Sequence, residues 1–260
     1  MAEELSERAE ALRRLHHGPL FVLPNAWDAA SARVLADAGF PAVASASAAV
    51  AASRGYPDND SMSVHEAFDA IATISQAVDL PVSADVEAGY GLEPAELVER
   101  LLESGAVGLN IEDSDHHGRK PLLDAEERAD YIREIKRIGR ASNVDLVVNA
   151  RVDVFVREVG APEARIGEAI RRGRLYRKAG ADCIYPIWVQ SDATIQMLVA
   201  ELGAPVNVLV RPGAPSLARL AQLDVARVTF GPGLQRVAMA ALARFVGRVS
   251  TQSDEPVFGE

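Results

Sequence analysis

The sequence predicts an α/β fold, a TIM-type (β/α)8 barrel that takes up residues 1–260 as a single domain. Three observations lead to this prediction. Short apolar segments recur along the chain, mostly without polar alternation, as expected of parallel strands that are covered on both faces. Amphipathic helical segments alternate with them. The chain has 260 residues, and single barrels commonly have about 250.

The predicted strands share a content of apolar and β-branched residues. They are residues 20–23, 42–45, 81–84, 107–111, 145–149, 182–186, 205–210 and 227–230. Eight strands that alternate with helices in a chain of this length favour a closed barrel, although a doubly wound open sheet would show similar local patterns. No linker-like segment divides the chain.

Two helices are predicted most clearly, in the segments EPAELVERLLESG and SDATIQMLVAELG. Pro94 suits a first helical turn, and Ser191 suits the position that caps a helix N-terminus. Gly105 and Gly203 end the apolar pattern, as glycines do at helix C-termini. A helix that ends on glycine just before a strand is also predicted from ADAGFPAVAS, LESGAVGLNI and RKAGADCIYP.

The two ends of the chain extend beyond the predicted barrel. The first fifteen or so residues are expected to form an extra helix before the first strand. The Ala-rich segment LQRVAMAALARFV predicts a C-terminal helical tail that suits packing between subunits. The last ten residues, TQSDEPVFGE, are expected to be loose or to pack on a partner.

Composition excludes several classes of protein. No apolar run approaches the roughly 20 residues that span a membrane, and the N-terminus lacks the apolar core of a signal peptide, so we expect a cytoplasmic protein without a membrane partner. The net charge of −10 argues against nucleic-acid binding. The single cysteine, Cys183, cannot form an internal disulfide and lies in an apolar strand, where we assign it no chemistry.

Polar residues gather where the predicted strands end. In a TIM barrel the C-terminal ends of the strands carry the active site. The residues in these positions are Asn25, Asp28, Ser45, Ser47, Asp58, Asp85, Glu87, Glu112, Asp113, Arg151, Asp153 and Asn207.

The segment SADVEAGYG predicts a metal site. Asp85 and Glu87 lie two residues apart, so their carboxylates share one face of an extended strand. Glu112, at the end of the next strand, would complete a set of oxygen ligands suited to Mg²⁺ or Mn²⁺. The alternative is that these acids are helix caps or solvated loop charges.

Arg151 follows the apolar run DLVVNA. Its guanidinium could clamp a substrate carboxylate through two parallel hydrogen bonds. It could instead form an ion pair with Asp153 or Glu112, and both arrangements could hold at once.

The segment DSDHHGRKPLLD is polar and predicts a mobile lid after Glu112. His116 and His117 could supply a proton near neutral pH, although adjacent histidines in a loop are often simply solvated. Gly-Pro-Gly at 231–233 could bind a phosphate or carboxylate, with a plain turn as the alternative.

Six stretches, in order and with their spacing, resemble the isocitrate lyase / phosphoenolpyruvate mutase superfamily. They are LPNAWDAASARVLADAGF, SASAAVAASRGYPD, PVSADVEAGYG, GLNIEDS, VVNARVD and AGADCIYP. The resemblance runs over residues 21–245. It implies the same barrel fold and an enzyme of this superfamily.

The resemblance implies roles for matching residues at the substrate. Ser45, Ala46 and Ser47 resemble the loop whose amides and hydroxyl hold the substrate carboxylate. Arg151 resembles the arginine that contacts the substrate's oxygens, and Asn207 resembles a polar residue of the same pocket. The implied substrate is a small 2-oxo carboxylate.

The resemblance also implies a metal centre. Asp85 resembles the principal Mg²⁺ ligand, with Asp58, Glu87 and Glu112 around the ion and its waters. Of these, Glu87 and Glu112 are expected at the metal, and Asp58 is expected to bind the substrate as well. The implied chemistry is polarisation of the 2-oxo acid, so that a pyruvate-like enolate becomes a leaving group or nucleophile. Assembly as a homo-oligomer is implied too, a dimer or a tetramer whose subunits exchange a C-terminal helix.

Several departures from the family pattern narrow the reaction. The lyases carry a cysteine acid in the lid, whereas HGRKP places His117 there. Ile187 stands where methylisocitrate lyases have a glutamate, and Glu87 replaces the commoner aspartate. The lid is also shorter than that of the phosphonate enzymes. We therefore expect catalysis by Arg151, Glu112 and His117, with Arg119 and Lys120 as further candidate lid groups.

These departures favour a divergent enzyme that cleaves or forms a C–C bond next to a 2-oxo carboxylate. Phosphonopyruvate hydrolase or mutase activity and oxaloacetate decarboxylation are the alternatives, as is a 2-oxo acid binding protein without turnover. A barrel for phosphate-bearing sugars or nucleotides has only RPGAPS as a candidate phosphate loop.

Overall fold

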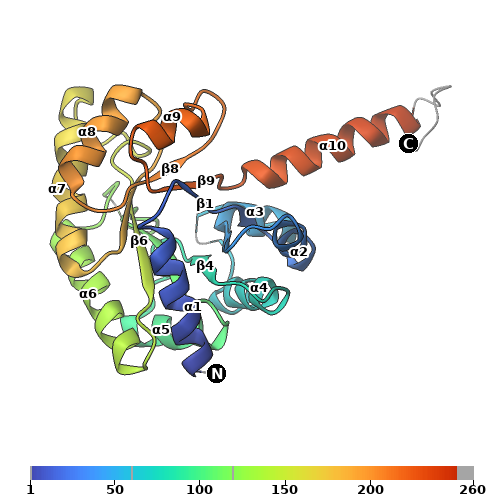
Figure 1. Ribbon diagram of the computed structural model, residues 1–260, viewed down its shortest axis with the longest axis horizontal. Coiled ribbons are helices and arrows are strands. Elements are labelled where there is room, and N and C mark those ends of the chain that lie inside the picture. The colour runs from blue at the N-terminus through green and yellow to red at the C-terminus, as the bar shows by residue number, and fades with distance from the viewer. Residues whose placement is uncertain (1, 60, 119, 251–260) are drawn as a thin grey trace.

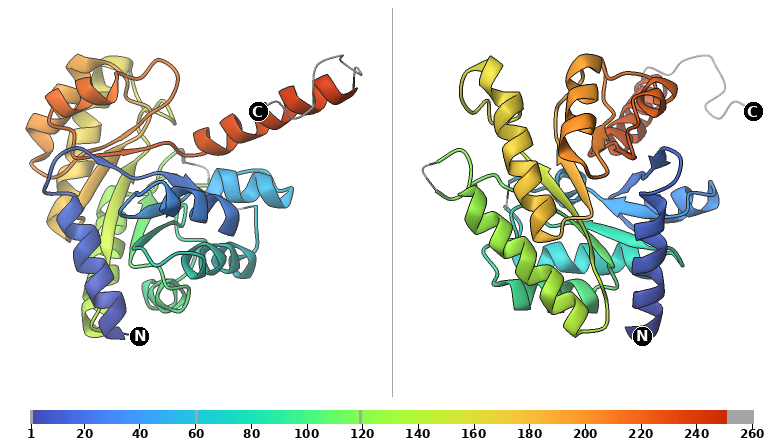
Figure 2. Two further views of the ribbon diagram at one scale, coloured as in Figure 1. Left: turned by 45° about the vertical axis from the view of Figure 1, so that its right-hand side comes forward. Right: turned by 60° about the vertical axis from the view of Figure 1, so that its left-hand side comes forward.

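The computed structural model describes residues 2–59, 61–118 and 120–250. Its centre is a ring of parallel strands with helices on the outside (Figures 1 and 2). This arrangement confirms the predicted (β/α)8 barrel.

The barrel wall consists of two hydrogen-bonded sheets in which every strand pair is parallel. The larger sheet has the order β2 (Asn25–Ala26), β3 (Val43–Ser45), β4 (Val82–Asp85), β5 (Gly108–Glu112), β6 (Val147–Val152) and β7 (Cys183–Pro186). The smaller sheet has the order β1 (Phe21–Val22), β9 (Arg227–Thr229) and β8 (Asn207–Leu209). A single bridge between Ile184 and Val206 joins β7 to the β8 side, and the chain itself joins β1 to β2.

The first barrel strand was predicted as one segment, residues 20–23. In the structure it consists of two short strands, β1 and β2, on either side of Pro24. The N–H of Leu23 donates to Val228, whereas the carbonyl of Pro24 accepts from Ala44. Proline has no N–H to continue the ladder with β9. The chain therefore changes partner from β9 to β3 at this residue.

The strand predicted at 145–149 also differs, because β6 begins at Val147 and continues to Val152. Arg151 thus lies within the strand, directly beside Glu112 in the register with β5. Asp145 precedes the strand and forms an ion pair with Lys136 at 2.7 Å. The apolar pattern of the sequence ends before the strand does, because Asn149 and Arg151 are polar.

The outer layer follows the predicted alternation of helix and strand. Its helices are α2 (Ala29–Asp37), α3 (Ser47–Arg54), α4 (Val64–Gln76), α5 (Pro94–Glu103), α6 (Ala125–Ala141), α7 (Pro162–Ala179), α8 (Asp192–Leu202) and α9 (Leu217–Gln222). Pro94 begins α5 as predicted, and Gly203 caps α8 in the left-handed conformation at φ 60°. Ser191 holds the N-cap position of α8, but its side chain forms no capping hydrogen bond.

The predicted N-terminal helix is α1 (Ala2–Leu15), which covers the end of the barrel where the strands begin. Leu12 is completely buried, and a Cβ atom on Gly108, the first residue of β5, would lie 2.7 Å from its Cδ2. Arg13 binds the Asp182 carboxylate at 3.0 Å. The helix therefore closes the floor of the barrel.

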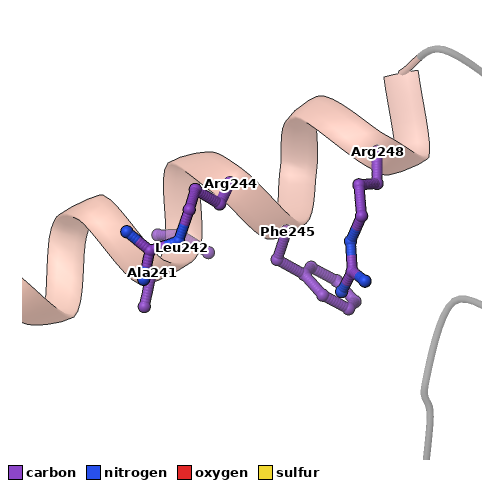
Figure 3. Close-up of a pocket in the computed structure, with 5 residues that line it drawn as sticks. All are labelled: Ala241, Leu242, Arg244, Phe245 and Arg248. Carbon is purple, nitrogen blue, oxygen red and sulfur yellow. The ribbon is translucent and has the colours of Figure 1, made fainter.

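The C-terminal helix α10 (Gly233–Ser250) projects away from the barrel (Figure 1). Leu242, Arg244, Phe245 and Arg248 line a shallow surface depression on it, with Ala241 (Figure 3). The guanidinium of Arg248 lies 5.7 Å from the centre of the Phe245 ring. The segment 251–260, for which we predicted a loose tail, lies outside the described residues. None of the described helices is both long and apolar enough to cross a membrane.

Candidate active site

Asp85 occupies the centre of the polar cluster at the C-terminal ends of the strands. Its Oδ2 accepts hydrogen bonds from the backbone N–H and the hydroxyl of Ser47, at 2.9 and 2.8 Å. Its Oδ1 accepts from the Asn110 side chain at 2.8 Å. The backbone N–H of Asp85 donates to the Ser45 hydroxyl at 2.8 Å. The loop around Ala46, the N-cap residue of α3, therefore lies directly against this carboxylate.

Arg151 forms ion pairs on both sides. Its Nη1 lies 2.5 Å from Glu112 Oε2. Its Nε and Nη2 donate to the two carboxylate oxygens of Asp153, at 2.6 and 2.9 Å. Both ion pairs considered for Arg151 are therefore present, and the two carboxylates hold the guanidinium in one orientation at the barrel mouth.

The lid brings His116, not His117, to this network. The Nε2 atom of His116 lies 2.7 Å from Glu112 Oε1, and its side chain is 5% exposed. His117 is exposed, because its N–H and that of Gly118 turn toward the Asp115 carboxylate. The structure thus places His116 against Glu112, and the catalytic role expected of His117 stays a prediction.

Arg119 and Lys120 are the other two candidate lid groups. Lys120 is exposed, and Arg119 lies outside the described residues. Counting residues along the chain could not show which lid side chain turns inward.

Electrostatic interactions tie the acidic residues together. Burial raises the pKa of Glu112 to about 7, against the lowering effect of the Arg151 guanidinium. The charges of Asp153 and Asp85 raise the pKa of Glu112 as well. Asp58 is exposed, but partial loss of solvation raises the pKa of its carboxyl as well, and the charge of Asp85 adds to that effect. The carboxylates at the mouth thus repel one another, which is the electrostatic setting that a bound cation relieves.

This donor set fits a hard cation that keeps most of its water. In the described part of the chain, no three His, Cys, Asp or Glu side chains converge as a ready set of ligands. Mg²⁺ is commonly bound by one or two carboxylates and several waters. Asp85, which is partly exposed, fits the direct ligand, with the carboxylates of Asp58 and Glu112 near enough to act on its charge.

The remaining predicted residues lie around this centre. Glu87 is buried, has a left-handed backbone at φ 50°, and accepts the N–H of Glu112 on its carbonyl at 2.9 Å. Asn207 is buried at the start of β8, where its amide contacts the Thr229 hydroxyl at 3.2 Å. The parallel bridge pairs Ile184 with Val206. The residues that follow, Tyr185 and Asn207, therefore lie at the same height in the barrel wall.

A comparison with known families assigns the chain. The family model described as phosphoenolpyruvate phosphomutase matches residues 12–250. The chain belongs to this family. Its relatives are lyases and mutases of the isocitrate lyase / phosphoenolpyruvate mutase superfamily, as the resemblance in the sequence predicted.

This chain is similar to one relative and two solved structures that carry different names. A 2-methylisocitrate lyase from Halalkalibacterium halodurans is 31% identical over 212 residues, which cover 78% of this chain and 67% of the relative. The structure of an oxaloacetate acetylhydrolase in complex with the product oxalate has a TM-score of 0.84 and 26% identity, covering 98% of this chain and 90% of the other. A phosphonopyruvate hydrolase complex with oxalate and Mg²⁺ has a TM-score of 0.83 and 25% identity, covering 94% and 87%.

One side of the mouth in this phosphomutase-family chain is apolar. Tyr185, Ile187 and Leu209 form a small buried cluster, with Val156 packed against it. Tyr185 stands directly beside Arg151 in the register of β6 and β7. We call these four residues the apolar wall. It adjoins the acidic half of the mouth.

Sequence reasoning missed Asn110 as a site residue. Its side chain joins Asp85 to Asn149, whose amide donates to the Asn110 Oδ1 at 2.9 Å. The available signal was its spacing from Glu112: the two polar residues lie two positions apart in an otherwise apolar strand, so their side chains share one face. His116 was considered together with His117, and the sequence had no signal that separated the two.

Proposed function

We propose that this protein is a Mg²⁺-dependent lyase that acts on a C–C bond next to a small 2-oxo carboxylate and releases a pyruvate-like enolate. The division of the mouth carries this proposal. Carboxylates and Arg151 occupy the β4–β6 side, where a 2-oxo acid and a cation would bind. The apolar wall occupies the β7–β8 side, where the other fragment of the substrate would lie.

The acidic half would hold the metal through Asp85, with Asp58, Glu87 and Glu112 around its waters. When bound, the ion withdraws electrons from the oxo and carboxylate groups of the substrate. The loop of Ser45, Ala46 and Ser47 supports this assignment because its N–H and hydroxyl donors already point at a carboxylate, that of Asp85. The same donors suit the carboxylate of a substrate.

Arg151 would orient the substrate and stabilise negative charge on its oxygens. Its fork to Asp153 fixes the guanidinium plane, so little freedom is lost when a substrate binds. Glu112 and His116 are in contact at 2.7 Å and form the pair that could move a proton beside Arg151. His117 and Lys120, which are exposed, would have to turn inward to take part.

The apolar wall favours carbon over phosphorus as the atom at the reacting bond. A phosphonate group carries charge on several oxygens and needs donors on every side. Val156, Ile187 and Leu209 offer none, but they suit a hydrocarbon-like fragment. Phosphonopyruvate hydrolysis or rearrangement is therefore the second choice, although structural neighbours with such names exist. Oxaloacetate decarboxylation also breaks a C–C bond, so the apolar wall does not argue against it, and relatives of that name exist.

Product analysis with a substrate panel tests this proposal. The purified protein and Mg²⁺ are incubated with 2-methylisocitrate, isocitrate, oxaloacetate and phosphonopyruvate, and 2-oxo acid products are measured. We expect a C–C substrate to yield product only with the metal, and phosphonopyruvate to yield none. Phosphate release from phosphonopyruvate would contradict the assignment of a C–C lyase. Tight binding of these acids without any product would favour a binding protein instead.

A further inference from the structure

The loop that follows β4, residues 86–92, has an unusual backbone. Glu87 and Tyr90 have φ values of 50° and 54°, and Gly89 and Gly91 have values of 97° and 69°. Left-handed conformations are unfavourable for residues with a Cβ atom, and they persist only where the surroundings determine them. Something outside the loop must therefore hold Glu87 and Tyr90 in place.

Two side chains of α6 bind the loop from outside the barrel. Arg128 donates from Nη2 to the carbonyl oxygen of Ala88 at 3.1 Å. Tyr131 donates from its hydroxyl to the carbonyl oxygen of Leu92 at 2.6 Å. The two hydrogen bonds lie on either side of Gly89, whose Cβ position is only 3.0 Å from the Tyr131 hydroxyl. We call Arg128 and Tyr131 the loop clamp.

The loop clamp is itself rigid. The guanidinium of Arg128 lies over the Tyr131 ring, 4.8 Å from its centre. Arg128 is 7% exposed, and its Nε and Nη1 meet no hydrogen-bond acceptor among the described residues. Burial of a guanidinium with unpaired N–H groups lowers the stability of the fold, and an apolar side chain would fill the same space without this desolvation penalty. The contact with the Ala88 carbonyl is the specific interaction that this arginine adds.

The loop connects the clamp to the proposed metal site. The carbonyl of Glu87 accepts the N–H of Glu112 at 2.9 Å, and the N–H of Val86 donates to the carbonyl of Asn110 at 3.1 Å. These bonds fix the loop to β5, which carries Glu112 and the partner of Asp85. A shift of the loop would move the carboxylate of Glu87 relative to both.

We propose that Arg128 and Tyr131 are positioning residues that hold Glu87 in its left-handed conformation, so that the affinity for a divalent cation depends on two side chains outside the ligand set. This inference rests on the proposed function, because it takes Glu87 as a residue of the metal site. It adds that α6, which directly follows the lid, also determines the geometry of that site.

The test is a titration of the full-length protein with Mn²⁺, followed by electron paramagnetic resonance. Tyr131→Phe removes only the hydroxyl donor, and Arg128→Met removes the donor to Ala88. We expect each change to raise the Kd for Mn²⁺ about tenfold, as loss of groups that orient metal ligands commonly does. Arg133→Met, on the exposed side of the same helix, is the control and should leave the Kd unchanged.

A second arm separates positioning from general destabilisation. In a Glu87→Ala background, Tyr131→Phe should change the Kd for Mn²⁺ less than about twofold, because the residue through which it acts is gone. Arg128→Lys, which keeps a donor, should recover part of the affinity that Arg128→Met loses. Thermal melting of each variant checks that it is folded.

Three results would overturn the inference. Unchanged Kd values in both clamp variants would refute the loop clamp while leaving the proposed function intact. A tenfold loss that persists in the Glu87→Ala background would show that the clamp acts by another route. Absence of Mn²⁺ and Mg²⁺ binding by the unaltered protein would overturn the proposed function together with this inference.

Discussion

Asp85 accepts three hydrogen bonds, two from Ser47 and one from Asn110. All three donors are neutral, so they orient the carboxylate without neutralising its charge. Arg151 forms its ion pairs with Glu112 and Asp153 instead. At the scale of single residues, this division leaves Asp85 as the partly exposed carboxylate that can attract a cation.

Replacing Asp85 with alanine should abolish Mg²⁺-dependent binding of oxalate, because the direct ligand of the ion is removed. Isothermal titration calorimetry with and without Mg²⁺ measures this. Cys183→Ala is the control, since burial raises the pKa of that thiol to about 12 and keeps it neutral. Oxalate binding that stays dependent on Mg²⁺ in the Asp85 variant would defeat the metal assignment.

Sequence reasoning could place Asp85, Glu112 and Arg151 together because the C-terminal ends of the strands meet at one face of a barrel. It could not choose between His116 and His117, because the turn of the lid depends on backbone contacts with Asp115. Such a contact has no signature in the residue pattern.

Among the elements, α1 determines how the barrel floor responds to pH. His16, just after this helix, is 3% exposed, donates from Nδ1 to the Leu12 carbonyl and packs edge-on against Phe21. Burial lowers the pKa of His16 to about 4, and the Arg227 guanidinium contributes to this. The fold therefore favours the neutral imidazole.

The resulting prediction concerns stability in acid. The pKa of His16 is lower in the fold than in the unfolded chain, so its contribution is complete above about pH 6.5 and is lost as the pH falls toward 4. The unfolding free energy of the unaltered protein should therefore fall between pH 7 and pH 4.5. In the His16→Gln variant this fall should be smaller by about 2–3 kcal/mol, as measured by urea unfolding. His65→Gln, at an 82% exposed side chain, should behave like the unaltered protein. Equal losses in all three would contradict the prediction.

Two glycines of α7 offer a matched pair for the packing of this helix. A Cβ on Gly167 would meet nothing within 4 Å, whereas one on Gly173 would crowd Leu202 and lie 3.0 Å from Ile184. Gly167→Ala should therefore raise the unfolding free energy by about 0.5–1 kcal/mol through backbone entropy. Gly173→Ala should lower it by about 1–3 kcal/mol through overpacking. Thermal unfolding curves that shift in the same direction for both variants would refute this packing.

The elements show where prediction from sequence ends. The helix of Pro94 was predictable because proline and glycine mark its two ends. The exchange of strand partners at Pro24 was not, because it depends on the distant residues Ala44 and Val228. Strand content was therefore easier to predict than strand continuity.

On the scale of the whole molecule, α10 is the feature that the barrel does not explain. Nine large hydrophobic side chains are exposed in the described part of the chain, and five of them lie on this helix. They are Val237, Met239, Leu242, Val246 and Val249. A single projecting helix with so much apolar surface suits burial against another subunit. We propose a homo-oligomer, a dimer or a tetramer, in which α10 packs on a neighbouring copy.

Sedimentation velocity tests this assembly. The unaltered protein should sediment as a dimer or tetramer, and Leu242→Asp together with Val246→Asp should shift it toward a monomer. Met197→Asp, at an exposed hydrophobic residue of α8, should leave the assembly intact. A monomer at all concentrations of the unaltered protein would refute the proposal.

The most direct test of the account is a crystal structure of the protein soaked with Mg²⁺ and oxalate. We predict one metal ion at the mouth of the barrel, with Asp85 as a direct ligand and with Glu112 facing its waters. Oxalate should bind the ion and contact Arg151 and the loop of Ser47. A metal ion bound elsewhere, or oxalate that lies away from Arg151, would contradict the claim that these strand ends form a single metal and 2-oxo acid site.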